Sequence, residues 1–341
     1  MFVRRPLAVC CALTLAATGS LVGVVSTSAS AATTSKVIYV IGYQTDNPFW
    51  ILEGKGAMAA GKAFGVTVRY EAPSGGAAAT DAGMISLADP ALATHPYGIA
   101  IDYTDKTMEA PVLKALAQGT KVVLYNNNLF EGKGSAATTN PKVTNLAYVG
   151  QTNTPGSPDA SGAVAARALL PYLPKGHGTV LIINPFAEAY VLTLRQAAAT
   201  STLKAAGYKT EDLIVNGDDP EASLEATIGA YLTGHKGIVG VVGLGDPAGN
   251  PATRYIMSKH LNVPVVTIDM ENETYDLMKA PGSVLKAAVD QEPYLQGYYA
   301  VEDLALEMKY GFIPVSVNTS NYIVTQSNLS GLSKLLTEGF D

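Results

Sequence analysis

The sequence predicts an α/β protein with two similar, doubly wound lobes. Short runs of β-branched and other apolar residues recur at regular intervals, and alanine-rich segments of helical length lie between them. Near-continuous apolar strands that alternate with helices indicate parallel sheets covered on both faces. The alternation runs once to about residue 148 and then begins again, which predicts the second lobe.

The predicted strands follow one another along the chain. They begin with VIYVIGY from Val37, VTVRY from Val66, GIAID from Gly98 and KVVLYNN from Lys121. Next come LAYVG from Leu146, TVLIIN from Thr179, DLIVNG from Asp212, IVGVVGLGD from Ile238 and VPVVTID from Val263. Segments such as ASGAVAARALLPYL and LTLRQAAATSTLKAAG supply the helices between them.

The first 31 residues have the features of a secretory signal peptide. Arg4 and Arg5 precede the apolar run PLAVCCALTLAATGSLVGVV, and Ala29-Ser30-Ala31 has the small-x-small form of a cleavage site. A membrane anchor is the alternative, but small residues interrupt the run and no second apolar run follows it. We therefore expect a secreted or extracytoplasmic protein, cleaved near Ala31, whose mature chain begins near Ala32 without a lipid.

The composition of the expected mature chain excludes several classes of function. Cleavage would remove both cysteines, so we expect no disulfide, thiol nucleophile or cysteine metal site. It would leave 21 basic against 29 acidic residues, a net charge of −8. An acidic chain without a Lys/Arg cluster is poorly suited to nucleic acid or anionic membranes. We expect neither as a partner.

Two glycine-rich stretches resemble nucleotide-binding loops but fail on inspection. In the first, residues 56–62, Ala63 stands where a Ser or Thr would hold magnesium, and the stretch lies within a predicted helix. In the second, residues 243–249, the last spacing is one residue too long and Pro247 removes a donor. The histidines are scattered and no HExxH or GxSxG motif occurs. We therefore expect no cofactor, no metal and no enzymatic activity.

Polar and aromatic side chains follow most of the predicted strands. Ligands of parallel sheets bind beyond the carboxyl ends of the strands, so these positions are the candidate site. They are Asn47, Phe49 and Trp50 in TDNPFW, then Asp102, Asn126, Asn127, Asp246 and Asp269. Any one Asn or Asp is an ordinary helix cap, but turn chemistry alone does not explain so many.

Several stretches resemble motifs of type 1 periplasmic sugar-binding proteins, the ribose/galactose-binding group that serves ABC importers. NPFW resembles the family's Asn-Pro-Phe-Phe at the start of the first helix. Arg195, followed by Leu203, resembles the arginine of an Arg-x-x-Gly-Phe-x-x-x-Leu helix, although alanines replace the Gly-Phe. VPVVTID and AAVDQEPYLQG resemble segments whose ligand-binding Asp and Gln fall on Asp269 and Gln291.

Two strand ends depart from the pattern of this family. KVVLYNN ends in Asn126-Asn127 where the family usually has Asp-Arg. IVGVVGLGD keeps the family's aspartate as Asp246 but has Gly245 in place of an asparagine. The resemblance thus covers the mature chain in order, with an altered set of polar groups at these two strands.

The resemblance implies a type 1 periplasmic-binding-protein fold, with two Rossmann-like lobes joined by three crossover segments near residues 148–153, 290–292 and 311–316. Residues 37–149 plus 292–313 would form the N-terminal lobe, and 150–291 plus 314–341 the C-terminal lobe. The ligand would lie between the lobes, which close about the crossovers. The implied ligand-binding residues are Asn47, Phe49, Trp50, Asp102, Asn126, Asn127, Arg195, Asp246, Asp269 and Gln291.

The residue types of this set favour a neutral sugar or polyol. Planar Asp, Asn, Gln and Arg side chains can bond two adjacent hydroxyls, and an aromatic ring packs on C–H faces. We expect one of Phe49 and Trp50 to reach the ligand and the other to pack against the first helix. Carboxylates outnumber the single Arg195, so an anionic ligand would be repelled. Truncation of Arg195 or Asp269 is expected to weaken binding and leave folding nearly intact.

The function implied by the resemblance is that of a monomeric binding protein that delivers its ligand to the membrane permease of an ABC importer. A ligand sensor for a chemoreceptor or sensor kinase is one alternative, since it could use the same scaffold. A secreted α/β enzyme is another, and the lack of a nucleophile–base pair in the sequence counts against it.

Overall fold

The computed structural model describes residues 35–339, apart from residues 128–138, 155 and 320–321. The predicted signal peptide and its cleavage site lie outside this range. Within the described residues, no helix is both long enough and apolar enough to cross a membrane.

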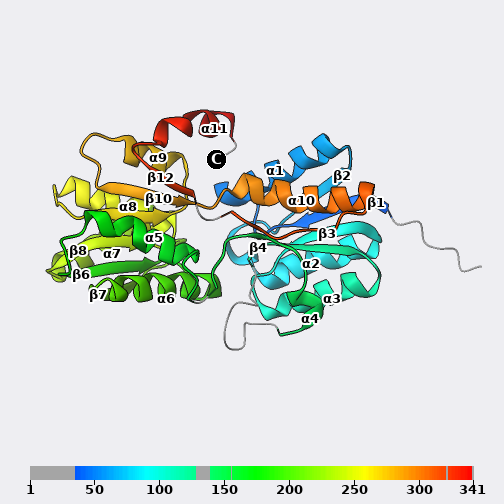
Figure 1. The fold of residues 1–341 in the computed structure, drawn as a ribbon, viewed down its shortest axis with the longest axis horizontal. Coiled ribbons are helices and arrows are strands. Elements are labelled where there is room, and N and C mark those ends of the chain that lie inside the picture. The colour runs from blue at the N-terminus through cyan, green and yellow to red at the C-terminus, as the bar shows by residue number, and fades with distance from the viewer. Residues whose placement is uncertain (1–34, 128–138, 155, 320–321, 340–341) are drawn as a thin grey trace, which may run out of the picture. The chain divides into compact units, whose positions relative to one another are not determined.

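Six parallel strands form the first sheet, in the order β11-β5-β4-β3-β1-β2, and Figure 1 labels β1 to β4 of this sheet. The strands are β1 (Ser35–Ile41), β2 (Thr67–Glu71), β3 (Pro96–Asp102), β4 (Lys121–Asn126), β5 (Tyr148–Gly150) and β11 (Val317–Asn318). Its helices are α1 (Pro48–Phe64), α2 (Asp81–Ala93), α3 (Glu109–Ala117), α4 (Pro141–Thr144) and α10 (Pro293–Tyr310).

Both faces of this sheet are buried, as the continuous apolar strands predict. Ile38 and Val40 of β1 pack under α1 and α10, whereas Tyr39 and Ile41 pack under α2 and α3. Successive side chains of a strand point to opposite faces, so one apolar run contributes side chains to the core on each face of the sheet. The first lobe is therefore doubly wound.

The second sheet has the order β12-β10-β9-β8-β6-β7 and repeats this plan. Its strands are β6 (Thr179–Asn184), β7 (Lys209–Ile214), β8 (Ile238–Gly243), β9 (Val265–Ile268), β10 (Leu285–Asp290) and β12 (Tyr322–Thr325). β12 pairs antiparallel with β10, and the other pairs are parallel. The helices are α5 (Ser161–Leu169), α6 (Tyr190–Ala205), α7 (Glu221–Gly234), α8 (Asp246–Ser258), α9 (Asn272–Lys279) and α11 (Ser333–Glu338). The core lies on both sheet faces, under α5 and α6 and under α7 to α9.

The expected boundary in the C-terminal part is wrong in one respect. We expected residues 314–341 in the second lobe, after a crossover at 311–316. Val317 and Asn318 instead pair with Val149 and Gly150 in the first sheet, so the chain leaves that sheet only after Asn318. This short strand covers the edge of β5, whose backbone groups would otherwise lack partners in the sheet.

Helix α1 begins and ends at the signals that its sequence carries. Asn47 caps it by accepting a hydrogen bond from the Phe49 backbone N–H at 2.9 Å, and Pro48 occupies the first turn. Gly65 ends it in the left-handed conformation, with φ 62°. Residues 56–62 lie inside this helix, as expected when we excluded a phosphate-binding loop.

Two glycines bring α1 and α10 into close contact. A Cβ on Gly56 would lie 1.9 Å from the Tyr294 carbonyl oxygen, and a Cβ on Gly297 would lie 2.0 Å from the Glu53 carbonyl oxygen. Only glycine permits such an approach of two helix backbones. As a result, polar side chains of both helices meet beneath the end of β4.

Candidate functional site

The structure places the predicted site residues at the carboxyl ends of the strands or on the helices that follow them. Asp102 and Asn126 end β3 and β4, and Asp246 begins α8 after β8. Asp269 directly follows β9, and Gln291 directly follows β10. Arg195 lies in the second turn of α6, and Asn47, Phe49 and Trp50 lie at the junction of β1 and α1.

The aromatic residues at the start of α1 form a small cluster. Phe49 and Trp50 meet edge to face with their ring centroids 5.2 Å apart, and Trp50 also lies 5.6 Å from the Tyr43 ring. Phe49 and Trp50 are only partly buried. An apolar surface that stays partly accessible can pack against the C–H face of a sugar. The side-chain oxygen of Asn47 is used by the helix cap.

A buried network of amides and carboxyls joins the ends of β3 and β4. The Asn126 Nδ2 donates to Glu53 Oε1 at 3.2 Å and to Gln296 Oε1 at 3.0 Å. The Asn127 Nδ2 donates to Asp102 Oδ1 at 2.9 Å and to Asn126 Oδ1 at 2.6 Å. Asn126 holds its place with a left-handed backbone, φ 57°. The structure therefore brings together three of the predicted residues.

Burial raises the pKa of two acids in this network. Glu53 and Asp102 are fully buried. Burial raises the pKa of Glu53 well above its usual value, and the nearby Asp102 adds to the rise. Burial also raises the pKa of Asp102, against the opposing hydrogen bond from Asn127. The side chains that form this network are amides and carboxyls, so they offer several hydrogen-bond acceptors.

Arg195 connects the crossover segments to the second sheet. Its guanidinium donates to the Leu244 carbonyl oxygen at 2.8 Å, to Gln151 Oε1 at 2.6 Å and to Gln291 Oε1 at 2.9 Å. Gln151 directly follows β5, and Gln291 lies between β10 and α10. The arginine is 5% exposed. Two of its three acceptors therefore come from the segments that join the lobes.

Asp269 lies beside this arginine. The Gln291 Nε2 donates to Asp269 Oδ1, and Asp269 has a left-handed backbone with φ 77°. Burial raises the pKa of Asp269, and Arg195 opposes that rise. Burial lowers the pKa of Arg195, and Asp269 opposes that change. The structure thus brings Arg195, Asp269 and Gln291 together, and their contact with a ligand stays a prediction.

Asp246 belongs to an acidic group at the ends of β8 and β9. Burial raises its pKa well above the usual value, and Glu271 and Asp269 raise it further. Burial, followed by Asp269, raises the pKa of Glu271 to about 7. Several carboxyl groups therefore share one poorly solvated region near Arg195.

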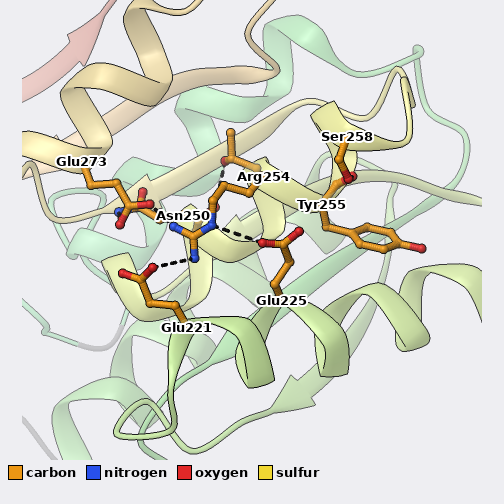
Figure 2. A network of polar contacts seen from close by, with 9 residues as sticks. Glu221, Glu225, Asn250, Arg254, Tyr255, Ser258 and Glu273 are labelled. Carbon is orange, nitrogen blue, oxygen red and sulfur yellow. Dashed lines mark hydrogen bonds and ion pairs between the residues drawn. The ribbon is translucent and has the colours of Figure 1, made fainter.

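A small cavity of about 160 Å³ opens beside Asp246 on α8. Its lining residues are Gly217, Asp219, Glu221, Leu224, Asp246, Pro247, Asn250, Pro251, Arg254 and Glu273. Arg254 projects among carboxylates from α7 and α9 and pairs with Glu225 at 3.3 Å, with Glu221 at 3.5 Å and with Glu273 (Figure 2). These ion pairs hold three helices together, so we assign Arg254 a structural role.

Sequence reasoning missed several members of these networks. Gln151 follows a predicted strand, so the rule that found Asp102 could have found it. Glu53, Gln296 and Glu271 gave no such signal, because Glu53 and Gln296 lie within helices and Glu271 lies three residues beyond the end of β9. Their importance depends on helix packing and on neighbouring charges, which no local motif records.

No group of three or more His, Cys, Asp or Glu residues in the described part of the chain is arranged to hold a metal ion. The polar groups of the site are amides, carboxyls and one guanidinium, which are hydrogen-bonding groups. The arrangement is suited to holding a molecule with several hydroxyls.

Comparisons with known proteins agree with this geometry. Residues 38–311 match the periplasmic binding protein domain family. A carbohydrate transporter from Acidothermus cellulolyticus 11B, solved in complex with myo-inositol, is 27% identical, with 89% of this chain and 99% of that chain covered and a TM-score of 0.72. No curated protein matches the sequence.

Two further solved structures share the fold at lower identity. GanP, a glucose-galactose binding protein from Geobacillus stearothermophilus, is 23% identical over 86% of this chain and 99% of its own, with a TM-score of 0.70. An ABC transporter solute-binding protein from Burkholderia graminis C4D1M, in complex with D-arabinose, is 22% identical over 86% and 96%, also with a TM-score of 0.70. The chain belongs to the periplasmic binding protein family and has the two-lobed fold of its type 1 sugar-binding members.

Proposed function

We propose that this protein captures a small neutral sugar or polyol between its two lobes and delivers it to the membrane permease of an ABC importer. One observation carries the proposal: buried amides and carboxyls gather at the carboxyl ends of both sheets, and the crossover residues Gln151 and Gln291 connect with them. A ligand held by both groups would stabilise one arrangement of the lobes. Family members are binding proteins of transporters, which supports a binding role without turnover.

The chemistry of the proposed contacts matches a polyhydroxylated ligand. Each hydroxyl donates one hydrogen bond and accepts others, so it can satisfy a carboxyl oxygen and an amide together. Asn127 and Asp102 would contact it from the first lobe, and Asp246 and Asp269 from the second. One of Trp50 and Phe49 would cover its apolar face. The similar transporter protein solved with myo-inositol supports a polyol of this kind.

The charge of the site supports a neutral ligand. Arg195 already donates to three oxygen atoms of the protein, and Asp269 lies beside it. An added anionic group would lie close to the carboxyl groups of Asp246, Asp269 and Glu271, whereas the guanidinium of the site is already hydrogen-bonded within the protein. Like charges in a poorly solvated site repel one another, so an acid should bind more weakly than its neutral counterpart.

A thermal-shift screen of the chain from Ala32 onward tests the proposal. The panel contains neutral aldoses, polyols and cyclitols, together with amino acids and sugar acids. A ligand at 100 times its Kd adds about 2.7 kcal/mol to the free energy of unfolding, which is readily measured. Chromatography of the recovered ligand checks that it is unchanged. Stabilisation by amino acids or sugar acids alone, or conversion of the ligand, would contradict the proposal.

Secretion and delivery require separate tests. Intact-mass analysis of the exported protein should give a chain that begins near Ala32 and carries no lipid, as a soluble monomer. Uptake of the identified ligand by cells should fall when the chain is deleted. Unchanged uptake with loss of a transcriptional or chemotactic response to the ligand would instead assign the protein to sensing.

A further inference from the structure

A row of amide side chains runs from a crossover segment to the ligand-binding edge of the first sheet. Gln296 Nε2 donates to the Gln291 backbone carbonyl at 2.8 Å, and Gln296 Oε1 accepts from Asn126 Nδ2 at 3.0 Å. Asn126 Oδ1 then accepts from Asn127 Nδ2, which also donates to Asp102 Oδ1. All five residues are buried, and Gln296 is 0% exposed.

The direction of this row is set at the backbone end. A carbonyl oxygen can only accept, so it fixes the Gln296 amide with its NH₂ toward Gln291 and its oxygen toward Asn126. Glu53 Oε1 adds a second acceptor beside the Asn126 NH₂, at 3.2 Å. Turning the Asn126 amide by half a turn would place its oxygen against these two oxygens, which is unfavourable.

The orientation of the Asn127 side-chain amide is fixed in the same way. Because the Asn126 oxygen points toward it, the Asn127 NH₂ serves both Asn126 and Asp102. The Asn127 Oδ1 and Asp102 Oδ2 atoms are left buried without a hydrogen-bond partner among the described residues. Buried acceptors of this kind are costly unless a ligand or water donates to them. They lie at the ends of the adjacent strands β3 and β4.

We propose that Gln296 is a positioning residue that orients the Asn126 and Asn127 amides, so that the site offers two acceptors, Asn127 Oδ1 and Asp102 Oδ2, to two hydroxyl donors of the ligand. Gln296 acts through Asn126 and does not contact the ligand. The inference rests on the proposed function for the identity of the ligand. The amide order itself exists without ligand and can be tested without it.

The first test is made on ligand-free protein by NMR of the asparagine side-chain amides. Gln296→Met removes both hydrogen bonds of Gln296 while keeping a side chain of similar size. We expect the Asn126 and Asn127 NH₂ resonances to shift and their exchange with solvent to rise about tenfold or more, because the amides are free to turn. Gln118→Met is the matched control, since Gln118 also donates to a backbone carbonyl, that of Leu92, in the same lobe.

The second test measures selectivity by calorimetry. The probes are myo-inositol, D-galactose and D-arabinose, with the monodeoxy derivatives of whichever binds best. In the wild type and in Gln118→Met, removal of either of two hydroxyls should weaken binding at least about tenfold. In Gln296→Met the parent probe should bind about 10 to 100 times more weakly, and the penalty for each deoxy derivative should fall below about threefold.

A conservative variant keeps the test decisive if Gln296→Met does not fold. Gln296→Glu at pH 5 retains an oxygen toward Asn126 and, when protonated, a donor toward Gln291, so it should keep the wild-type amide resonances. The positioning role would be overturned if Gln296→Met kept the wild-type amide resonances and the wild-type loss of affinity for the deoxy derivatives. It would also be overturned if Gln296→Glu at pH 5 lost them. If no probe binds, the proposed function fails, and the NMR result still decides the amide order.

Discussion

Replacing Arg195 with methionine should weaken both the fold and ligand binding. The sequence alone suggested that truncation would leave folding nearly intact, but the structure leads to a different expectation. The guanidinium is buried and donates to Leu244, Gln151 and Gln291, so its loss leaves acceptors from the second sheet and from two crossover segments unpaired.

The magnitude follows from these three bonds. A hydrogen bond to a charged group contributes about 1.5–3 kcal/mol, so the gross loss is large. Removal of the buried charge also removes its desolvation cost, and the two glutamine amides can turn toward water. The Leu244 carbonyl oxygen cannot turn. We therefore expect a net loss of about 2–4 kcal/mol in the free energy of unfolding, or about 4–8 °C in Tm.

Urea unfolding and calorimetry with the identified sugar measure the two effects. Lys204→Met is the matched control, because Lys204 lies on the same helix but is exposed, and it should cost about 0.5 kcal/mol or less. The Asp269 carboxyl should also protonate at higher pH in Arg195→Met, because the charge that opposes the rise in its pKa is gone. Wild-type stability and affinity in Arg195→Met would refute this reasoning.

Three further outcomes follow from the charges of the second lobe. Burial and Asp269 raise the folded-state pKa of Glu271 to about 7. Between about pH 4.5 and 7, this side chain therefore binds more protons in the folded state than in the unfolded state. The stability of the wild type should therefore fall by about 1–2 kcal/mol as pH rises through this window, and urea unfolding of Glu271→Gln should show a flatter profile. Arg254→Met leaves Glu221, Glu225 and Glu273 without their cation, so unfolding should require about 1–2 kcal/mol less at 0.1 M NaCl, with a smaller difference at 1 M. An equal loss at both salt concentrations would point to packing instead of charge. An aldose should bind more tightly than its aldonate in calorimetry at pH 7, and the reverse order would contradict our account of the acidic site.

The alternation of strands and helices and its repetition in two lobes could be predicted because each depends on a pattern that is local in the sequence. An apolar run that alternates with helices must be buried on both faces, so both doubly wound sheets followed from periodicity. The short strand β11 could not be predicted in the same way. Val317 and Asn318 join the first sheet because the edge of β5 is open to them, and that edge exists only after folding.

In the candidate site too, residues that follow a local sequence pattern could be predicted, and residues that depend on the folded structure could not. Asp102, Asn126, Asp246 and Asp269 were predicted because each stands at or just beyond the end of a strand, where parallel sheets bind ligands. Glu53 and Gln296 were missed because they lie within two helices more than two hundred residues apart in the chain. Their meeting depends on Gly56 and Gly297, which permit the close approach of those helices.

The replacement of a charged pair by Asn126 and Asn127 explains why this part of the site depends on its surroundings. A carboxylate accepts and a guanidinium donates in any orientation, whereas an amide does either, according to the direction in which it is turned. Two adjacent amides therefore acquire a defined pattern only when other groups fix them. Here Gln296 on α10 and Glu53 on α1 fix the direction of the Asn126 amide by accepting hydrogen bonds from its NH₂ group. Under the proposed function, ligand recognition at the first lobe thus depends on the packing of two helices as well as on the residues at the strand ends.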